Sequence, residues 1–280
     1  MLSLGLDLSA QPARAVVVDE RGQVVARATG ATGSQAARAA AKGQSPGVAG
    51  SAHVNRGETD KISVPGLKSI TRCAAGAAAM AAEAWIGAAR GTRHAICLCI
   101  GDEVYAGVML DGRPWAGAHD RAGAAAWLAL NPVERQDYRK LGSLAAEVSA
   151  RGIARRLSWR VQAGDESRVL DAAGGSLDAI TERHVFDGAR SGDGVAISVV
   201  RDTARYIGMA VATLAAAIDP EVVIVGGSVA VADLMLEPVR MECARRLPAD
   251  TMKDLRVEFS ALGSDAVAIG AARIALNASA

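Results

Sequence analysis

The stretch Ile218-Asp219-Pro220-Glu221-Val222-Val223-Ile224-Val225-Gly226-Gly227-Ser228 places a short apolar run between a proline and a pair of glycines. Residues 221–225 predict a buried strand, because the run is rich in valine and is bounded by turn-forming residues. Residues 226–228 predict a tight turn, and residues 229–247 predict a helix after it. The backbone amides of such a turn and the start of a helix can hold a phosphate, but the same glycines also serve close packing of strand against helix.

Helices and strands continue on both sides of this unit. The apolar stretch 194–218 predicts a long helix that ends before Pro220. Residues 255–261 predict a final strand, and 265–276 predict a closing helix. Upstream, residues 141–159 and 176–188 also predict helices. The C-terminal half is therefore expected to be mainly helical.

Two other regions share the pattern of three short strands joined by tight turns. The predicted strands are 2–8, 14–19 and 23–28 in the first region, and 95–100, 104–110 and 113–116 in the second. Between the regions, we expect a helix at 34–42, a loop at 44–61 and an alanine-rich helix at 70–90. This repetition predicts a duplicated α/β protein with two lobes and a cleft between them. We expect a small lobe of residues 1–92, completed by the helix at 264–280, and a large lobe of residues 93–263.

The composition argues against several classes of protein. Half of the 280 residues are hydrophobic and 22% are charged, which indicates a globular chain. With a net charge of +1 and 3% aromatic residues, nucleic acid is not an expected partner. The longest apolar stretches, 73–82 and 209–218, are about half of a bilayer span, so no membrane partner is expected either. The N-terminus lacks the pattern of a signal peptide, which predicts a cytoplasmic location with reduced cysteines.

The order of these motifs resembles the ROK family (repressor, open reading frame, kinase), whose sugar kinases have the actin-like ATPase fold. The resemblance is strongest at 207–228, which is similar to the family's helix, Asp-Pro-Glu, strand and Gly-Gly adenosine motif. It continues at 110–149 and 262–272. It implies an actin-like fold, a homodimer, and a site for ATP or ADP with Mg²⁺. The residues that the resemblance assigns to the nucleotide are Asp7, Gly101, Gly226, Gly227 and Ser228.

This chain departs from the family where the phosphates and the reacting hydroxyl would lie. The family's first phosphate loop, Asp-x-Gly-Gly-Thr, reads Asp7-Leu8-Ser9-Ala10-Gln11, and the second, Gly-Thr-Gly-x-Gly, reads Gly101-Asp102-Glu103-Val104-Tyr105. Two carboxylates thus stand where a polyphosphate would pass, and like charges repel. The family's general base, which takes the proton of the sugar hydroxyl, falls on Ala75 or Ala74.

The family's sugar and zinc positions are replaced as well. Its sugar-binding Glu and His fall on Ala124 and Trp127, and a later sugar-binding Glu falls on Ala145. Its zinc-binding cysteines fall on Gln136, Tyr138 and Ser143. These side chains are poor zinc ligands, so we expect no zinc. We expect Trp127 and Tyr138 to fill the volume of the metal site and packing to hold the Tyr138 loop.

The sequence therefore predicts a ROK protein that is catalytically inactive or strongly impaired. Such a pseudokinase would have a ligand-binding or regulatory role, with weak affinity for ATP or ADP or for a small sugar. The alternative is an ATP-dependent hexose kinase, similar to glucokinase, that uses divergent residues. A third hypothesis is a subunit that only binds a partner protein. A strand that starts at Leu2 leaves no room for a helix-turn-helix, so we do not expect a repressor.

Overall fold

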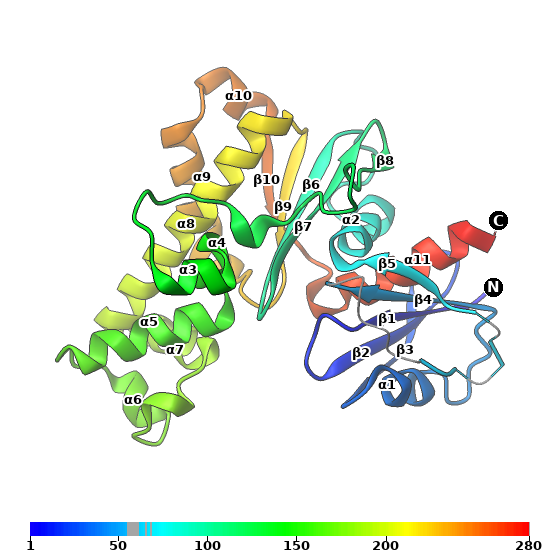
Figure 1. Ribbon diagram of the computed structural model, residues 1–280, viewed down its shortest axis with the longest axis horizontal. Helices are drawn as coiled ribbons and strands as arrows, with labels where there is room; N and C mark the ends of the chain where they lie inside the picture. Colours follow the sequence, from blue (N-terminus) through cyan, green and yellow to red (C-terminus); the bar gives the residue numbers. More distant parts are fainter. Residues whose placement is uncertain (55–61, 65, 68, 280) are drawn as a thin grey trace. The chain divides into compact units, whose positions relative to one another are not determined.

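The computed structural model describes residues 1–54, 62–64, 66, 67 and 69–279. These residues form two five-stranded sheets with helices around them (Figure 1). The chain divides into two compact units. Unit 1 contains residues 1–99, 105–123 and 260–280, and unit 2 contains residues 100–104 and 124–259. The predicted α/β fold class is confirmed, and the two predicted three-stranded regions belong to separate sheets.

The first sheet lies in unit 1 and has the strand order β3-β2-β1-β4-β5. Its strands are β1 (Ser3–Asp7), β2 (Ala13–Val18), β3 (Val24–Gly30), β4 (Val48–His53) and β5 (Thr71–Ala74). Strand β1 is antiparallel to β2, with Ser3 opposite Val18, and parallel to β4, with Gly5 opposite Gly50. Apolar side chains of β1 and β2, including Leu4 and Val17, are buried in the core of this unit.

Strand β4 corrects the loop that the sequence predicted over residues 44–61. The part of that stretch at residues 55–61 lies outside the described residues. Small residues such as Gly50 are typical of loops, but here they have a packing function. A Cβ atom on Gly50 would lie 2.0 Å from the carbonyl oxygen of Ala271 in the closing helix. The absence of a side chain therefore lets that helix lie directly against the sheet.

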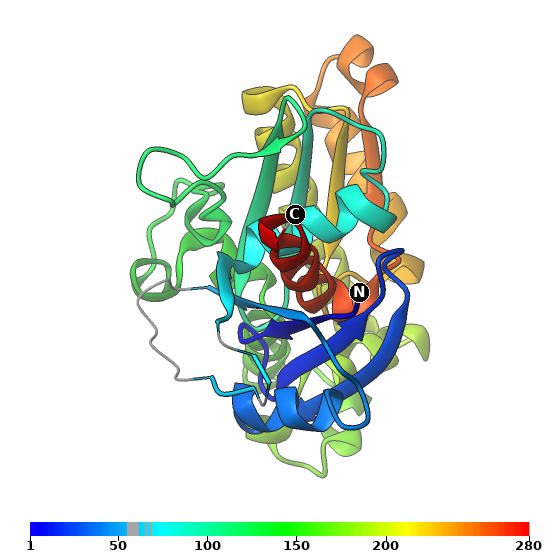
Figure 2. The same ribbon diagram turned by 90° about the vertical axis from the view of Figure 1, so that its right-hand side faces the viewer.

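Three helices pack in unit 1: α1 (Gly33–Ala40), α2 (Ala75–Ile86) and α11 (Ala266–Ser279). Figures 1 and 2 show α11 against α2 and against the first sheet. Gly270 makes this contact close, because a Cβ atom there would lie 1.6 Å from the carbonyl oxygen of Ala78. The predicted helix at 70–90 is wrong in its first turn, where β5 pairs with β4 before α2 begins.

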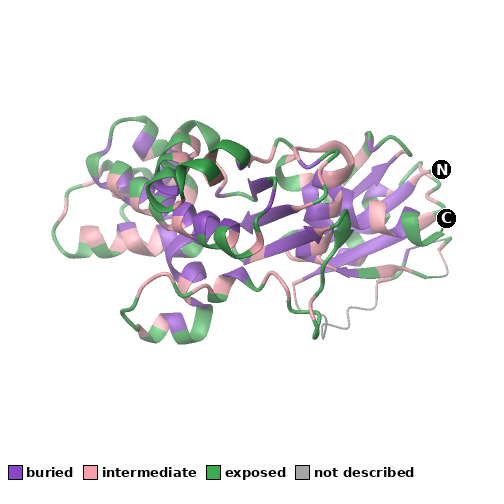
Figure 3. Ribbon diagram, turned by 90° about the horizontal axis from the view of Figure 1, so that it is seen from above, coloured by how far each residue is buried: buried purple, intermediate pink, exposed green. Residues whose placement is uncertain are grey.

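The second sheet has the strand order β10-β9-β6-β7-β8. Its strands are β6 (Ala95–Ile100), β7 (Val104–Leu110), β8 (Arg113–Pro114), β9 (Val222–Gly226) and β10 (Arg256–Phe259). Strands β9 and β10 are parallel, with Val222 opposite Arg256. Every residue of β6 and β9 is buried, as the purple strands in Figure 3 show. This burial explains why both sequences are continuous apolar runs.

Most of the helices among the described residues lie in unit 2. They are α3 (Gln136–Leu141), α4 (Ser143–Val148), α5 (Ala150–Gln162), α6 (Arg168–Ala172), α7 (Glu182–Arg190), α8 (Gly194–Ile218), α9 (Ala232–Arg246) and α10 (Ala249–Asp254), with single 3₁₀ turns at η1 (Ala125–Trp127) and η2 (Leu177–Ala179). A third 3₁₀ turn, η3 (Gly263–Asp265), precedes α11. Helix α8 has the predicted bounds. The predicted helix at 141–159 is instead interrupted, because Gly142 has a φ of 89° and Ser149 caps α5. In the part of the chain that the structure describes, no helix is both long enough and apolar enough to cross a membrane.

Candidate functional site

The glycine pair after β9 forms a tight turn in unit 2. Gly227 has a φ of +94°, and a Cβ atom there would lie 2.2 Å from the carbonyl oxygen of Ile100. The N–H of Val229 donates to the same oxygen at 3.1 Å. Gly227 is therefore required by a backbone contact, whether or not an anion binds. Helix α9 begins at Ala232, three residues later than predicted, so its N-terminus does not directly follow the turn.

The structure brings Gly101, which the resemblance assigns to the nucleotide, next to this turn. A Cβ atom on Gly101 would lie 3.3 Å from the Ser228 hydroxyl oxygen. The N–H of Ala150 donates to the Gly101 carbonyl at 2.8 Å, which fixes the loop to the start of α5. Asp102 and Glu103 are exposed at its tip. Gly101, Gly226, Gly227 and Ser228 thus lie together, and the exposed Asp102 and Glu103 follow Gly101 in the chain.

This turn has two groups that fit an anion. Gly227 and Ser228 are exposed, and within the described residues neither of their backbone N–H groups has a hydrogen-bond acceptor. Consecutive free N–H groups can donate to a phosphate oxygen. The carboxylates of Asp102 and Glu103 oppose such an anion through charge repulsion.

Asp7 lies in unit 1, at the end of β1, with 4% of its surface exposed. Its Oδ1 accepts a hydrogen bond from the Ser9 N–H at 2.9 Å and another from the Ser9 hydroxyl. The Ser9 hydroxyl oxygen also lies 3.1 Å from that of Tyr105. Burial raises the pKa of Asp7, although the Ser9 bonds oppose the shift. The carboxylate therefore already has partners within its own hairpin, in a dry environment.

The two positions that match the family's general base lie where β5 meets α2. Ala74 is the residue before the helix and makes no side-chain cap, and Ala75 is its first residue and is buried. A methyl group cannot accept a proton, so neither residue can act as a base.

The three residues that match the family's sugar-binding positions lie in unit 2 and differ in how far they are buried. Ala124 is exposed before η1, Ala145 is buried in α4, and Trp127 is 58% exposed. The expectation that Trp127 fills the metal-site volume is therefore wrong. Tyr138, in contrast, is buried with 5% exposure, as expected. An alanine side chain has no polar atom, so the side chains of Ala124 and Ala145 cannot form a hydrogen bond with a sugar.

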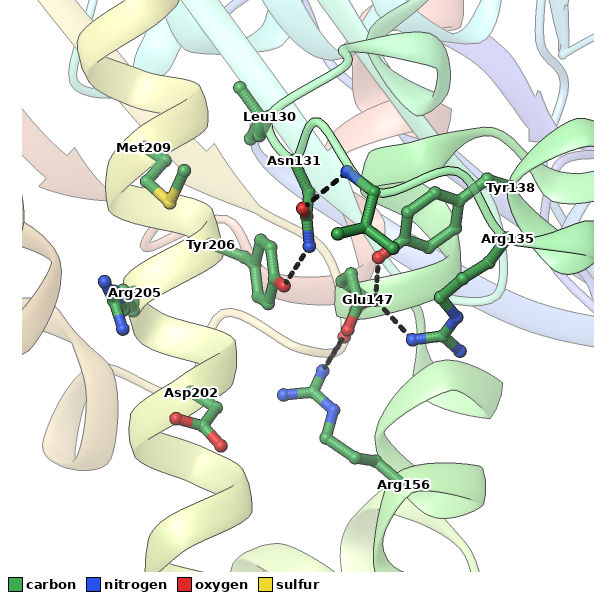
Figure 4. Close-up of a pocket in the computed structure, with 11 residues that line it drawn as sticks. Leu130, Asn131, Arg135, Tyr138, Glu147, Arg156, Asp202, Arg205, Tyr206 and Met209 are labelled. Atoms are coloured by element: carbon green, nitrogen blue, oxygen red, sulfur yellow. Dashed lines mark hydrogen bonds and ion pairs between the residues drawn. The ribbon is translucent and has the colours of Figure 1, made fainter. Parts of the chain in front are cut away.

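Charged side chains, rather than packing alone, hold the Tyr138 loop (Figure 4). Glu147, which is 6% exposed, accepts a hydrogen bond from the Tyr138 hydroxyl and one from Arg135 Nη1 at 3.0 Å. Arg156 Nη2 lies 3.5 Å from the other carboxylate oxygen and also donates to the Glu147 carbonyl. Burial and the bond to Glu147 raise the pKa of Tyr138. We call Arg135, Tyr138, Glu147 and Arg156 the Glu147 network.

Sequence reasoning missed this network, although Glu147 stands two residues after Ala145 on the same short helix. A second carboxylate supports it: Asp137 Oδ2 lies 2.7 Å from Arg135 Nη2 and 2.9 Å from Arg155 Nη2. Among the residues that the structure describes, no group of three His, Cys, Asp or Glu side chains is placed to hold a metal ion. The ion pairs of Glu147 and Asp137 thus lie around Tyr138, one of the positions that the resemblance assigns to zinc ligands.

Comparison with known proteins gives one consistent result. A model of the ROK family matches residues 70–278. The chain is 30% identical to a glucokinase of Halalkalibacterium halodurans over 194 residues, which are 67% of this chain and 58% of that protein. It is 31% identical to a glucokinase of Thermotoga maritima over 197 residues, 69% of this chain and 61% of that one. The chain therefore spans less than two thirds of these curated relatives.

Solved structures show the same fold over nearly the whole chain. A ROK glucokinase from Streptomyces griseus, in complex with glucose and AMPPNP, superposes with a TM-score of 0.85 at 24% identity and covers 99% of this chain and 100% of its own. A ROK hexokinase from Thermus thermophilus superposes with a TM-score of 0.77 at 23% identity, covering 100% of both chains. At these identities the likeness concerns the fold.

Proposed function

Because this chain belongs to the ROK family, we propose that it is a sugar-kinase-like protein that has lost phosphoryl transfer and acts as a ligand-binding or regulatory protein. The relatives named glucokinase support the sugar-kinase ancestry. The loss of activity is the new element of the proposal. It rests on the chain's own residues at three positions: the end of β1, the start of α2 and the Gly101 loop.

The observation that carries the proposal is the state of Asp7. Mg²⁺ in nucleotide sites is held by carboxylate oxygens and keeps several water molecules. Asp7 is almost fully buried, and its Oδ1 accepts two hydrogen bonds from Ser9, whose hydroxyl also meets Tyr105. Burial disfavours a negative charge here and raises the pKa of this carboxyl, which supports the same conclusion as the hydrogen bonds. Asp7 in this setting does not fit a Mg²⁺ ligand.

Two further losses act on the same reaction. A general base typically contributes roughly a hundred- to ten-thousand-fold in rate, and Ala74 and Ala75 cannot supply it. Asp102 and Glu103 place negative charge beside the turn where phosphates would bind. Positioning, charge stabilisation and proton transfer are thus all weakened. Weak binding of ATP or ADP at Gly227 and Ser228 remains compatible with these residues.

The alternative is an ATP-dependent hexose kinase that uses divergent residues. Identity of about 30% to glucokinases over two thirds of the chain favours it. In that case a carboxylate other than the family's base must take the proton, and the exposed Asp102, Glu103 and Asp120 are the first candidates. Our proposal also includes a homodimer and a cytoplasmic location, which rest on the family resemblance and on composition. Light scattering on the purified chain tests the dimer.

A coupled assay of ADP release decides between these functions. The chain is incubated with Mg-ATP and a panel of hexoses and amino sugars, with a ROK glucokinase as positive control. We expect turnover at least about a thousandfold below the ordinary kinase range of about 1 to 100 per second. Turnover within that range for any sugar would refute the proposal. The variants Asp102→Asn and Glu103→Gln would then identify the base.

A further inference from the structure

A cavity of about 530 Å³ lies in unit 2, beside the Glu147 network. It is bordered by α8 on one side and by the segment from Leu130 to Glu147 with α5 on the other (Figure 4). Its volume is in the range of about 300 to 1,000 Å³ that small-molecule sites occupy. Ala124, Trp127, Ala145 and the Gly227 turn do not line it. The cavity is therefore built from residues other than those that the family resemblance assigns to the sugar or the nucleotide, although Tyr138, which stands at a zinc position of the family, lines it.

Glu147 is not available to a ligand, because the other members of its network already bind it. Arg156 has spare capacity: its Nη1 is buried without a hydrogen-bond partner in the described part of the chain. A buried donor without an acceptor costs about 1–3 kcal/mol, so a ligand that supplies an acceptor gains from the contact.

Helix α8 contributes groups of both signs to the same cavity. Arg205 Nε reaches Glu242 only at 3.9 Å, and its side chain is 65% exposed. Asp202 makes no side-chain hydrogen bond or ion pair with any described residue, although its charge acts on Arg156. Tyr206 accepts a hydrogen bond from Asn131 at 3.4 Å and presents its ring beside Met209. The cavity thus offers donors, an acceptor and an apolar surface.

We propose that this cavity binds a neutral polyhydroxylated molecule of the size of a monosaccharide. An anion attracted by Arg156 and Arg205 would lie against the Asp202 carboxylate, and a cation attracted by Asp202 would lie against the two guanidinium groups. A hydroxyl group avoids both conflicts, because it accepts from a guanidinium and donates to a carboxylate. The C–H face of such a ligand can pack on Tyr206 and Met209. The proposal does not depend on whether the chain transfers phosphate.

Calorimetric titration with three six-carbon probes of different charge tests the ligand class. The probes are D-glucose, which is neutral, D-gluconate, which is an anion, and D-glucosamine, which is a cation. We expect D-glucose to bind more tightly than both charged probes. Tighter binding of gluconate or glucosamine, or no binding of D-glucose, would overturn the proposal.

Matched variants on α8 test the place of binding. Arg205→Met removes a cavity donor, whereas Arg201→Met changes an exposed arginine one turn earlier that does not line the cavity. We expect Arg205→Met and Asp202→Asn each to weaken D-glucose binding about tenfold, which corresponds to about 1.4 kcal/mol, and Arg201→Met to leave it unchanged. Equal affinities of Arg205→Met and Arg201→Met would refute the site, because the sugar would then bind elsewhere. Circular dichroism of each variant verifies folding, and ADP release separately measures the proposed loss of catalysis.

Discussion

Replacing Glu147 with glutamine tests the network that holds the Tyr138 loop. The side chain of Glu147 is 7% exposed and that of Arg156 is 16% exposed, so water can replace little of what the carboxylate provides. Removing one partner of a buried ion pair costs about 3–5 kcal/mol. The glutamine carbonyl oxygen still accepts one hydrogen bond, which returns about 1 kcal/mol. We therefore expect the free energy of unfolding to fall by about 3 kcal/mol, or the Tm by about 6–12 °C.

Glu237→Gln is the matched control for this substitution. Glu237 also pairs with an arginine, Arg240, at 2.8 Å in unit 2, but its side chain is 72% exposed. Exposed pairs contribute about 0–1 kcal/mol, so this variant should unfold nearly as the parent does. Guanidinium unfolding followed by circular dichroism measures both. If the two variants lose stability equally, to within about 0.5 kcal/mol, the loop does not depend on the Glu147 network.

Three other outcomes can be measured on the same protein. Burial raises the pKa of Asp7 above its ordinary value of 3.8, so the folded protein loses stability as the pH rises from that value through the raised pKa. Asp7→Asn should therefore be more stable than the parent at pH 7, with a smaller advantage near pH 4. A variant that is less stable than the parent at pH 7 would contradict this. In urea unfolding without nucleotide, Gly227→Ala should lower the free energy of unfolding by about 2 kcal/mol more than Gly164→Ala does. Gly164 is the control because its φ is +103° but nothing lies within 4 Å of an added Cβ atom. Elemental analysis of protein purified without chelator should find well under one zinc per chain, and stoichiometric zinc would disprove the assignment of Gln136, Tyr138 and Ser143.

Much of the fold could be predicted because local patterns determine its elements. The apolar run of β9, the turn at Gly226 and the long α8 ending before Pro220 all follow from neighbouring residues. Strand β4 could not be predicted in this way. Its small residues are selected by the close approach of α11, which is more than two hundred residues away in the sequence.

The same distinction applies to the candidate site: contacts between motifs could be predicted, and contacts between residues of separate elements could not. The resemblance assigns both Gly101 and Ser228 to the nucleotide, and the structure places them next to each other. The Glu147 network draws on α3 and the residue before it, on α4 and on α5, so no short-range pattern joins Arg135, Glu147 and Arg156. Trp127 shows the converse error: a large apolar side chain was expected inside, but the 3₁₀ turn that carries it directs it to solvent.

The contact between Gly227 and the Ile100 carbonyl has a consequence for how such chains evolve. A lineage that stops using nucleotides still needs glycine at this position, because any side chain would collide with the neighbouring backbone. Selection for a folded protein is therefore enough to keep the Gly-Gly pair while the residues around it diverge. The pair at the end of β9 therefore reports an intact scaffold, whereas this chain departs from the family's motifs at Ser9, Ala10 and Gln11 and at the first residues of α2.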